Sequence, residues 1–287
     1  MQDLSWDDLR LLLVLARSGR LSLAARQLGV DETTVGRRLT RCEERLAGPL
    51  FARAGGRLEP TPRALPLIEA AARMEVESLS AQAATGRVGG RLRLTAVPLV
   101  ANRLLIPALP DLLAQHAGLE LEIIAEPSQL SVLRGEVDLA LRFAKPDAEA
   151  RALTRRLADL PFAPYCLADQ DPTKAPWITY EPAMQALPQA QWMAARLKGS
   201  DERAAQISVH DGETLVQALK AGLGRSLLPC AVGDALAHLK RCGPVSLRRP
   251  LWVLLHPLRK DLPALRLVLD WLTQAVKPWE RAPDDPA

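Results

Sequence analysis

Aromatic residues are scarce in this 287-residue chain, where Phe, Trp and Tyr together make up 4% of the sequence. Proteins that read single-stranded nucleic acids or RNA stack the bases on aromatic side chains, so this class is disfavoured. Lysine is scarce as well: only 7 of the 37 basic residues are Lys, and the first is Lys145. Every earlier basic residue is therefore arginine, which suits bidentate contacts to phosphate and guanine better than lysine does. A GC-rich genome would produce the same bias.

Cysteines are few and widely spaced, at Cys42, Cys166, Cys230 and Cys242. There is no Cys-x-x-Cys and no histidine at metal-ligand spacing, so we predict no disulfide, no metal site and no cofactor. Cys230 and Cys242 could form a redox pair, but buried, inert thiols are the preferred interpretation.

No apolar run approaches the ~18 residues that a membrane span requires. The acidic start of the chain lacks the basic and apolar pattern of a signal peptide. We therefore expect a cytoplasmic protein without a membrane partner.

Enzyme motifs are also lacking. The sequence contains no Gly-x-Ser-x-Gly, no P-loop and no carboxylate pair at useful spacing. We predict no catalytic residues and a protein that is not an enzyme.

The first 60 residues have the pattern of short helices separated by turns. Ser5 and Asp8 form a capping-box pattern at the start of the first helix, and Ser22 is expected to cap a second helix at 23–28. Asp31 is expected to cap a third helix that runs to about residue 46. Two such helices joined by a short Gly-containing turn predict a helix-turn-helix.

The third helix carries one apolar and one basic face. On a helical wheel Val35, Leu39 and Cys42 share the buried side. The opposite side and its flank carry Thr33, Thr34, Arg37, Arg38 and Arg41. A helix with Thr and Arg facing outward near its start suits a major groove, although ordinary solvated helices are also charged.

A basic hairpin follows this helix. Gly55-Gly56 predicts a tight turn with Arg53 and Arg57 on either side. Between Arg17 and Arg57 nine arginines face four acidic residues, a local charge of +5 that exceeds the +4 of the whole chain. The basic charge therefore lies on the helix-turn-helix, as expected for duplex binding.

The rest of the chain alternates strands and helices after a glycine-rich segment at 86–90. A long Ala-rich helix, expected from residue 61 to about 84, precedes this hinge and buries little by itself, so pairing with a second copy is expected. The alternation that follows predicts parallel βαβ units.

Taken in order, these blocks resemble a LysR-type transcriptional regulator over nearly the whole chain. The resemblance rests on Leu23-Ala24-Ala25-Arg26-Gln27-Leu28-Gly29-Val30, Pro49-Leu50-Phe51-Ala52-Arg53, Gly135-Glu136-Val137-Asp138-Leu139-Ala140-Leu141-Arg142 and Gly222-Leu223-Gly224. It implies an all-α plus α/β protein: a winged helix-turn-helix at 1–60, a linker and dimerisation helix at 61–86, a hinge at 87–90, a two-lobed effector-binding domain at 91–277 and a disordered tail at 278–287. Lobe I would comprise about 91–160 plus 256–277, and lobe II about 161–255.

The resemblance implies a nucleoid-associated regulator that binds promoter DNA sequence-specifically as a homodimer or homotetramer. It also implies a small-molecule effector and, for an activator, RNA polymerase as a partner. Glu32 departs from the family, since it stands where a base-reading Gln is common. Its carboxylate could accept from a cytosine amino group or repel phosphate.

The second half is similar to periplasmic solute-binding proteins, which bind ligands between two lobes. The resemblance places effector contacts at Pro98, Leu99, Val100, Ser128, Arg142, Phe143 and His210. Arg142 could clamp a carboxylate or form a salt bridge, and His210 could instead be a loop or capping residue. Because residues 98–100 offer no hydroxyl group, an apolar ligand remains open. A secreted solute-binding protein is the rival class, and the N-terminal helix-turn-helix argues against it.

Overall fold

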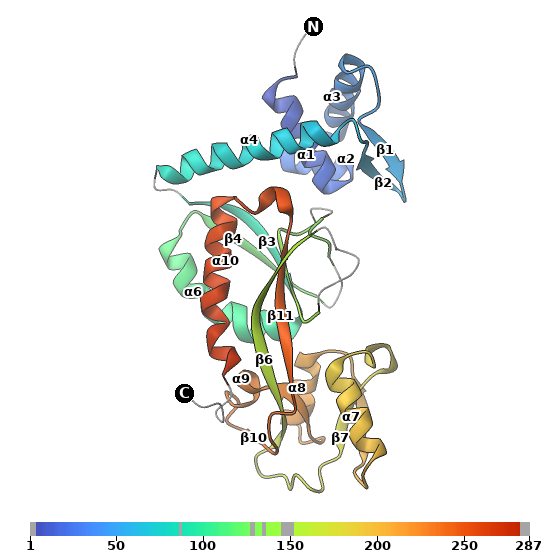
Figure 1. The fold of residues 1–287 in the computed structure, drawn as a ribbon, viewed down its shortest axis with the longest axis vertical. Coiled ribbons are helices and arrows are strands. Elements are labelled where there is room, and N and C mark those ends of the chain that lie inside the picture. Colours follow the sequence, from blue (N-terminus) through green and yellow to red (C-terminus); the bar gives the residue numbers. More distant parts are fainter. Residues whose placement is uncertain (1–3, 86–87, 127–129, 134–135, 145–151, 282–287) are drawn as a thin grey trace.

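The computed structural model describes residues 4–85, 88–126, 130–133, 136–144 and 152–281. An N-terminal helical module, a long helix and a two-lobed α/β body follow one another along the molecule (Figure 1). The longer helices are α1 (Trp6–Ser18), α2 (Leu21–Leu28), α3 (Glu32–Arg45), α4 (Leu65–Ala84), α6 (Ile106–Gln115), α7 (Pro188–Lys198), α8 (Gly212–Lys220) and α10 (Pro263–Ala275). Shorter helical segments are α5 (Pro98–Val100), η1 (Ala101–Leu105), η3 (Pro182–Met184), α9 (Cys230–Gly233), η4 (Pro257–Arg259) and η5 (Lys277–Glu280).

The strands are β1 (Phe51–Ala54), β2 (Arg57–Pro60), β3 (Gly90–Ala96), β4 (Leu119–Ala125), β5 (Leu139–Arg142), β6 (Leu153–Leu167), β7 (Trp177–Tyr180), β8 (Ala204–Val209), β9 (Ser226–Pro229), β10 (Leu239–Arg241) and β11 (Leu247–Leu255). The antiparallel pair β1–β2 is the predicted hairpin.

Local signals set the ends of the first helices. The capping box is confirmed, since the Asp8 amide donates to Ser5 Oγ at 3.2 Å and the Ser5 amide donates to Asp8 Oδ2 at 3.1 Å. The expected cap at Ser22 is wrong: α2 already begins at Leu21, with Arg20 at the N-cap position. Asp31 does occupy the N-cap of α3, but its carboxylate accepts only from Thr34 Oγ1, at 3.4 Å. Backbone geometry rather than side-chain capping therefore starts α2 and α3.

Helix α4 connects two hydrophobic cores. Its first half contributes Ile68, Ala71 and Ala72 to the core built around α1. Further along, Val76 and Leu79 pack against the core of the α/β body. The helix is therefore more than a spacer, because both parts of the protein bury side chains against it.

The main sheet is mixed rather than parallel throughout. Strand β3 pairs in parallel with β4 and β5, as the alternation predicted. The long strands β6 and β11 are antiparallel to each other, and they also pair antiparallel with β9, β10 and β5. The prediction of parallel units is therefore wrong for these strands, which run back and forth along the body.

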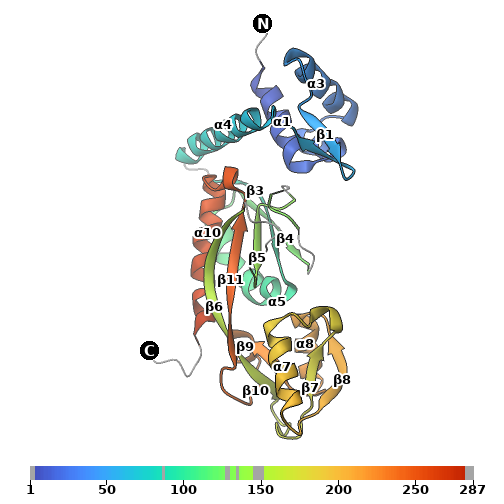
Figure 2. The same cartoon turned by 45° about the vertical axis from the view of Figure 1, so that its right-hand side comes forward.

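Strands β6 and β11 extend from one lobe to the other (Figure 1). The expected lobe boundary at residue 160 falls inside β6, so the strands themselves form the connection between lobes. Lobe II adds the parallel pair β7–β8 with α7 and α8 beside it, seen at the bottom of Figure 2. In the same view α5 lies at the end of lobe I that faces lobe II.

A cluster around Glu202 holds the outer part of lobe II together. Glu202 accepts hydrogen bonds from Trp177 Nε1 at 2.8 Å and from Arg196, and its carboxylate lies 2.9 Å from Arg225 Nη2. The Arg196 hydrogen bonds, assisted by Trp177 and Arg225, lower the pKa of Glu202 to about 2.

The end of the chain is more ordered than expected. Residues 277–280, of which 278–280 belong to the predicted disordered tail, form η5, and Trp279 is buried against the body. An aromatic ring that packs into a core fixes the short segment that carries it. Residues 282–287 lie outside the described part of the chain. None of the described helices is long and apolar enough to cross a membrane.

Candidate functional site

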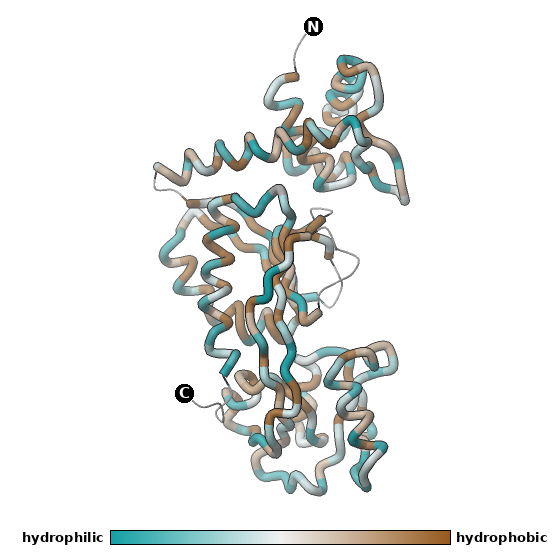
Figure 3. Tube along the Cα trace, in the orientation of Figure 1, coloured by the Kyte–Doolittle hydropathy of each residue, from teal (hydrophilic) through white to brown (hydrophobic). Residues whose placement is uncertain are grey.

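The basic face of α3, defined here as Thr33, Thr34, Arg37 and Arg41, lies at the outer end of the molecule. The residues Thr33, Arg37 and Arg41 are exposed, while Val35, Leu39 and Cys42 are buried against the first core. Helix α3 is mostly hydrophilic along its length (Figure 3). Within the described residues, neither Arg37 nor Arg41 has a hydrogen bond or ion pair. Both guanidinium groups are therefore available to an external anion.

Arg38 is held by the protein itself, contrary to its predicted role as a DNA contact. Its Nη2 lies 3.5 Å from Asp8 Oδ1, and Arg45 Nη1 lies 3.3 Å from Asp8 Oδ2. Burial alone would raise the pKa of Asp8, but hydrogen bonds from Ser5 and Arg38 outweigh it and keep this pKa below its usual value. Arg38 thus ties α3 to the start of α1, next to the basic face.

The wing of the helix-turn-helix is the hairpin β1–β2, and its two arginines, Arg53 and Arg57, differ in their surroundings. Arg53 is exposed on β1, as expected for a phosphate contact. Arg57 instead turns inward: it donates to the Ser18 carbonyl at 3.1 Å and to Glu136 Oε1 at 3.1 Å. Its prediction as a DNA contact does not fit this geometry, because its guanidinium joins α1 to the α/β body. Glu32 is exposed at the first turn of α3, where it can reach a bound duplex.

Glu43 was missed by the sequence reasoning. Its Oε1 accepts from the amides of Leu50 and Phe51, at 2.8 and 3.3 Å, and so fixes the base of the wing to α3. A glutamate two residues before a helix end carries no distinct sequence signal for this contact to the wing.

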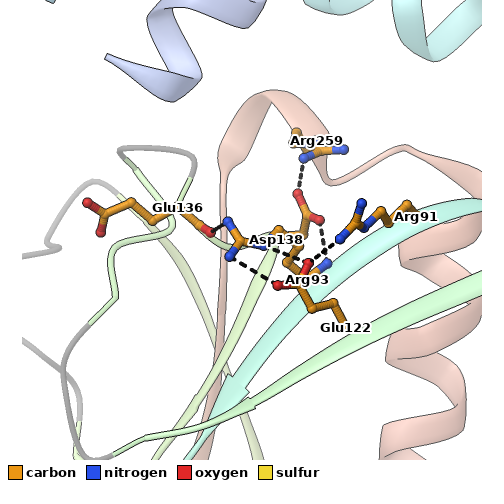
Figure 4. A network of polar contacts seen from close by, with 6 residues as sticks. All are labelled: Arg91, Arg93, Glu122, Glu136, Asp138 and Arg259. Carbon is orange, nitrogen blue, oxygen red and sulfur yellow. Dashed lines mark hydrogen bonds and ion pairs between the residues drawn. The ribbon is translucent and has the colours of Figure 1, made fainter. Parts of the chain in front are cut away.

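A polar network continues from Glu136 into the α/β body (Figure 4). Arg93 donates to the Glu136 carbonyl at 2.5 Å and to both carboxylate oxygens of Glu122. The Arg93 amide donates to Asp138 at 2.7 Å, and Asp138 also pairs with Arg259. The wing is therefore connected through one ion pair to the segment that leads into β5.

Breaking the Arg57–Glu136 pair is expected to loosen the docking of the helix-turn-helix on the body. Both side chains are 24% exposed, so a double-mutant cycle with Arg57→Ala and Glu136→Ala should give a coupling energy of about 0.5–1 kcal/mol. The measurement is urea unfolding of the four proteins at low and high salt, with smaller coupling at high salt. Additive effects of the two substitutions would show that the pair contributes nothing.

A cavity of about 340 Å³ lies where the two lobes meet. Of the predicted effector contacts, Pro98, Leu99, Arg142, Phe143 and His210 line it. Val100 does not, because this last residue of α5 is fully buried, and Ser128 lies outside the described residues. The remaining lining residues are Val97, Ala144, Phe162, Tyr180, Met184, Leu187, Gln189, Asp211, Gly212, Leu227, Leu228, Pro229 and Arg249.

Of the predicted polar effector contacts, Arg142 makes hydrogen bonds within the protein and His210 is largely exposed. Arg142 donates to the carbonyls of Leu141 and Leu130, at 3.0 and 3.4 Å. The His210 side chain is 55% exposed and lies 3.5 Å from Asp211. Asp211 caps α8 by accepting from the amides of Glu213 and Thr214. These residues shape the cavity wall without leaving an obvious free charge.

Arg249 is the lining residue that the sequence reasoning missed. It lies on β11, is 5% exposed, and places its guanidinium 4.5 Å from the centre of the Phe143 ring. Burial lowers its pKa to about 10. The available signal was an arginine pair, 248–249, inside an apolar strand, where alternation sends one side chain inward.

The two lobes also contact each other directly beside the cavity. Arg103 of η1 forms a bidentate pair with Glu213 of α8, with N–O distances of 2.8 and 2.7 Å. A Cβ atom added to Gly212 would lie 3.1 Å from Leu99, so the backbone of α8 packs closely against α5. A change in lobe closure must therefore alter these contacts.

Cys230 and Cys242, which the sequence offered as a possible redox pair, are not neighbours in the structure. The thiol of Cys242 neighbours Cys166, not Cys230, and burial next to that thiol raises the pKa of Cys242 to about 12. Burial also raises the pKa of Cys42 and Cys230. A raised pKa makes a thiol a poor nucleophile. Within the described ranges, no group of three His, Cys, Asp or Glu side chains could hold a metal.

Comparison with known proteins matches both parts of the chain. Residues 6–65 match the family model of the bacterial regulatory helix-turn-helix protein, lysR family, and residues 85–277 match the LysR substrate binding domain. The Mau operon transcriptional activator of Paracoccus denitrificans is 28% identical over 278 residues, which cover 93% of this chain and 95% of the activator.

Solved structures share the fold. ArgP from Mycobacterium tuberculosis aligns with a TM-score of 0.64 at 19% identity and covers 98% of this chain and 100% of its own. LysG from Corynebacterium glutamicum, with bound effector Arg, aligns with a TM-score of 0.63 at 16% identity over 97% of this chain and 100% of its own. The expected combination of a helix-turn-helix and a two-lobed α/β domain is thereby confirmed. Since the two family models together cover most of the sequence, the chain belongs to the LysR family of transcriptional regulators.

Proposed function

We propose that this regulator binds promoter DNA sequence-specifically by placing the basic face of α3 in the major groove. The observation that carries the proposal is the pair Arg37 and Arg41, exposed one helical turn apart and without a partner in the described residues. A 14-residue helix fits lengthwise in a groove about 12 Å wide. Arg37 then reaches a guanine edge and Arg41 a phosphate, while Arg53 of the wing contacts the backbone alongside.

Glu32 adds selectivity at the start of α3. An exposed carboxylate at the helix N-terminus accepts a hydrogen bond from a cytosine amino group and repels a misplaced phosphate. Sequence preference thus arises from attraction at Arg37 and from repulsion at Glu32.

The cavity between the lobes is the proposed effector site. Its volume of about 340 Å³ and its mainly apolar walls suit a small organic molecule. A ligand there bridges α5 and α8, so it favours one arrangement of the lobes over another. LysG, solved with bound effector Arg, shares this fold, which supports a small-molecule effector for this chain. An activating member would also contact RNA polymerase.

We further propose that α4 pairs with α4 of a second copy. Ala70, Met74 and Ala81, spaced four and seven residues apart, lie away from the side that carries Ile68 and Ala72. Met74 is 44% exposed, although it is a large apolar side chain. Burying this stripe in a two-fold interface gives a dimer, and two dimers give the tetramer.

Met74→Glu is expected to weaken the dimer at least about tenfold, because burying Met74 and its copy contributes a few kcal/mol that a carboxylate pair would forfeit. Sedimentation at several concentrations measures the association. Glu69→Gln, on the same helix but away from the stripe, is the control and should leave the dimer intact. If both variants self-associated as tightly as the wild type does, this interface would be ruled out.

Selection of bound fragments from random duplex DNA tests the function itself. The full-length protein should enrich a recurring pair of half-sites whose centres are separated by about one helical turn, roughly 34–36 Å, or a multiple of it. Failure to enrich any sequence over the starting pool would contradict the proposal.

A further inference from the structure

Two polar side chains lining the cavity each have a buried atom without a hydrogen-bond partner among the described residues. Arg249 is 5% exposed, and its Nε makes no hydrogen bond to any described residue. Gln189, at the first turn of α7, is also 5% exposed and has no donor for its Oε1 in the same part of the structure. Buried polar atoms are rarely left unsatisfied, and an unpaired group inside a binding cavity indicates what the ligand supplies.

Arg225 is a buried arginine outside the cavity, and it serves as a comparison for Arg249. It is 7% exposed, lies 4.4 Å from the centre of the Trp177 ring, and pairs with Glu202 at 2.9 Å. Arg249 has the aromatic contact, to Phe143, but the described residues provide no carboxylate for it. Both leave Nε without a hydrogen-bond partner among the described residues, so the two arginines differ in the ion pair that Arg225 has and that no described residue offers to Arg249.

Arg249 carries a positive charge at neutral pH. Its pKa, lowered by burial to about 10, still leaves the guanidinium protonated. The π face of Phe143 offsets part of the cost of burying a cation, yet it cannot accept the N–H bonds of the guanidinium fork as a carboxylate does.

Asp211, which also lines the cavity, carries the opposite charge. Its carboxylate caps α8 and remains ionised, since its hydrogen bonds hold its pKa low. A second negative charge on a ligand would therefore meet repulsion near Asp211.

We propose that the effector is an organic monocarboxylate whose carboxylate group binds Arg249. Its apolar body lies against Phe143, Phe162 and Met184, and a hydroxyl or N–H group donates to Gln189. This assignment deepens the proposed function and rests on the cavity being the effector site. The anion-binding group then comes from β11, so the lack of hydroxyl groups at residues 98–100 does not argue against a carboxylate.

Matched acid and amide probes test the charge directly. The full-length protein is titrated calorimetrically with phenylacetate and phenylacetamide, 4-hydroxyphenylacetate and its amide, and octanoate and octanamide, all at one ionic strength and at millimolar concentrations. At least one acid should bind about tenfold or more tightly than its amide, the size expected for a charged hydrogen bond.

Two variants assign the preference to Arg249. In Arg249→Met the preference for the acid should vanish, and in Arg248→Met, which removes the neighbouring exposed arginine of β11, it should persist. Urea unfolding confirms that both variants are folded, whereas binding to the selected duplex would not report on the α/β body, because α3 belongs to a separate core.

Three results would overturn the proposal: equal binding of acid and amide in every pair, no binding of any probe, or the same acid preference in Arg249→Met. If uncharged probes bound wild type and Arg249→Met equally, the cavity would remain the effector site and only its charge assignment would fail. Failure of the DNA selection would instead contradict the proposed function, whatever the cavity binds.

Discussion

Arg37→Ala is expected to weaken binding of the full-length protein to its selected duplex by about 10- to 100-fold, the value of one bidentate contact to guanine. The side chain is exposed on α3 with no partner in the described structure, so its removal leaves the first core intact. Fluorescence anisotropy at fixed salt, with the selected duplex and a shuffled one, measures both affinity and sequence preference. The preference should fall together with the affinity.

Arg38→Ala is the matched control on the same helix. Arg38 pairs with Asp8, so its loss should lower thermal stability slightly and leave the preference for the selected duplex in place. Arg41→Ala should instead weaken binding to both duplexes alike and reduce the salt slope by about one. If Arg37→Ala and Arg38→Ala lost sequence preference equally, the basic face would be wrongly assigned.

Arg225→Met is expected to lower the free energy of unfolding by about 2 kcal/mol, because it breaks a nearly buried ion pair and leaves Glu202 with fewer donors. Glu202 retains Arg196 and Trp177, which keeps the loss below that for a fully orphaned charge. In contrast, Arg249→Met should leave this free energy unchanged or raise it, since an unpaired buried cation is exchanged for an apolar side chain.

Urea unfolding measures both variants. Tryptophan fluorescence follows the unfolding, since the chain has six tryptophans, and two of them, Trp177 and Trp192, pack together in lobe II with ring centres 5.5 Å apart. The opposite signs expected for two arginines of similar burial isolate the effect of the partner. A loss of about 2 kcal/mol in Arg249→Met would mean that Arg249 stabilises the fold and is not reserved for a ligand.

Features encoded by neighbouring residues were predictable from the sequence. The capping box of Ser5, the glycine ends of α1 and α2 and the apolar stripe through Val35 and Leu39 depend on spacing alone. The two-lobed body followed from the family resemblance and not from periodicity. Periodicity by itself predicted parallel units, and it had no means of showing that β6 and β11 return antiparallel across both lobes.

The partners of the arginines were not predictable, because they lie far apart in the sequence. Arg57 meets Glu136, and Arg38 meets Asp8, so two of the predicted DNA contacts also form ion pairs within the protein. Arg249 depends on Phe143 and on the absence of an acid, a property of the folded cavity. Charge counting located the basic module correctly but could not say which of its arginines were free.

Methylation interference on the selected duplex tests most directly whether the basic face of α3 reads the major groove. Methylation of guanine N7, which lies in that groove, should block wild-type binding at one or more guanines in each half-site, and Arg37→Ala should lose the interference at the guanine it contacts. Interference confined to minor-groove adenine N3, or N7 interference unchanged in Arg37→Ala, would contradict the account.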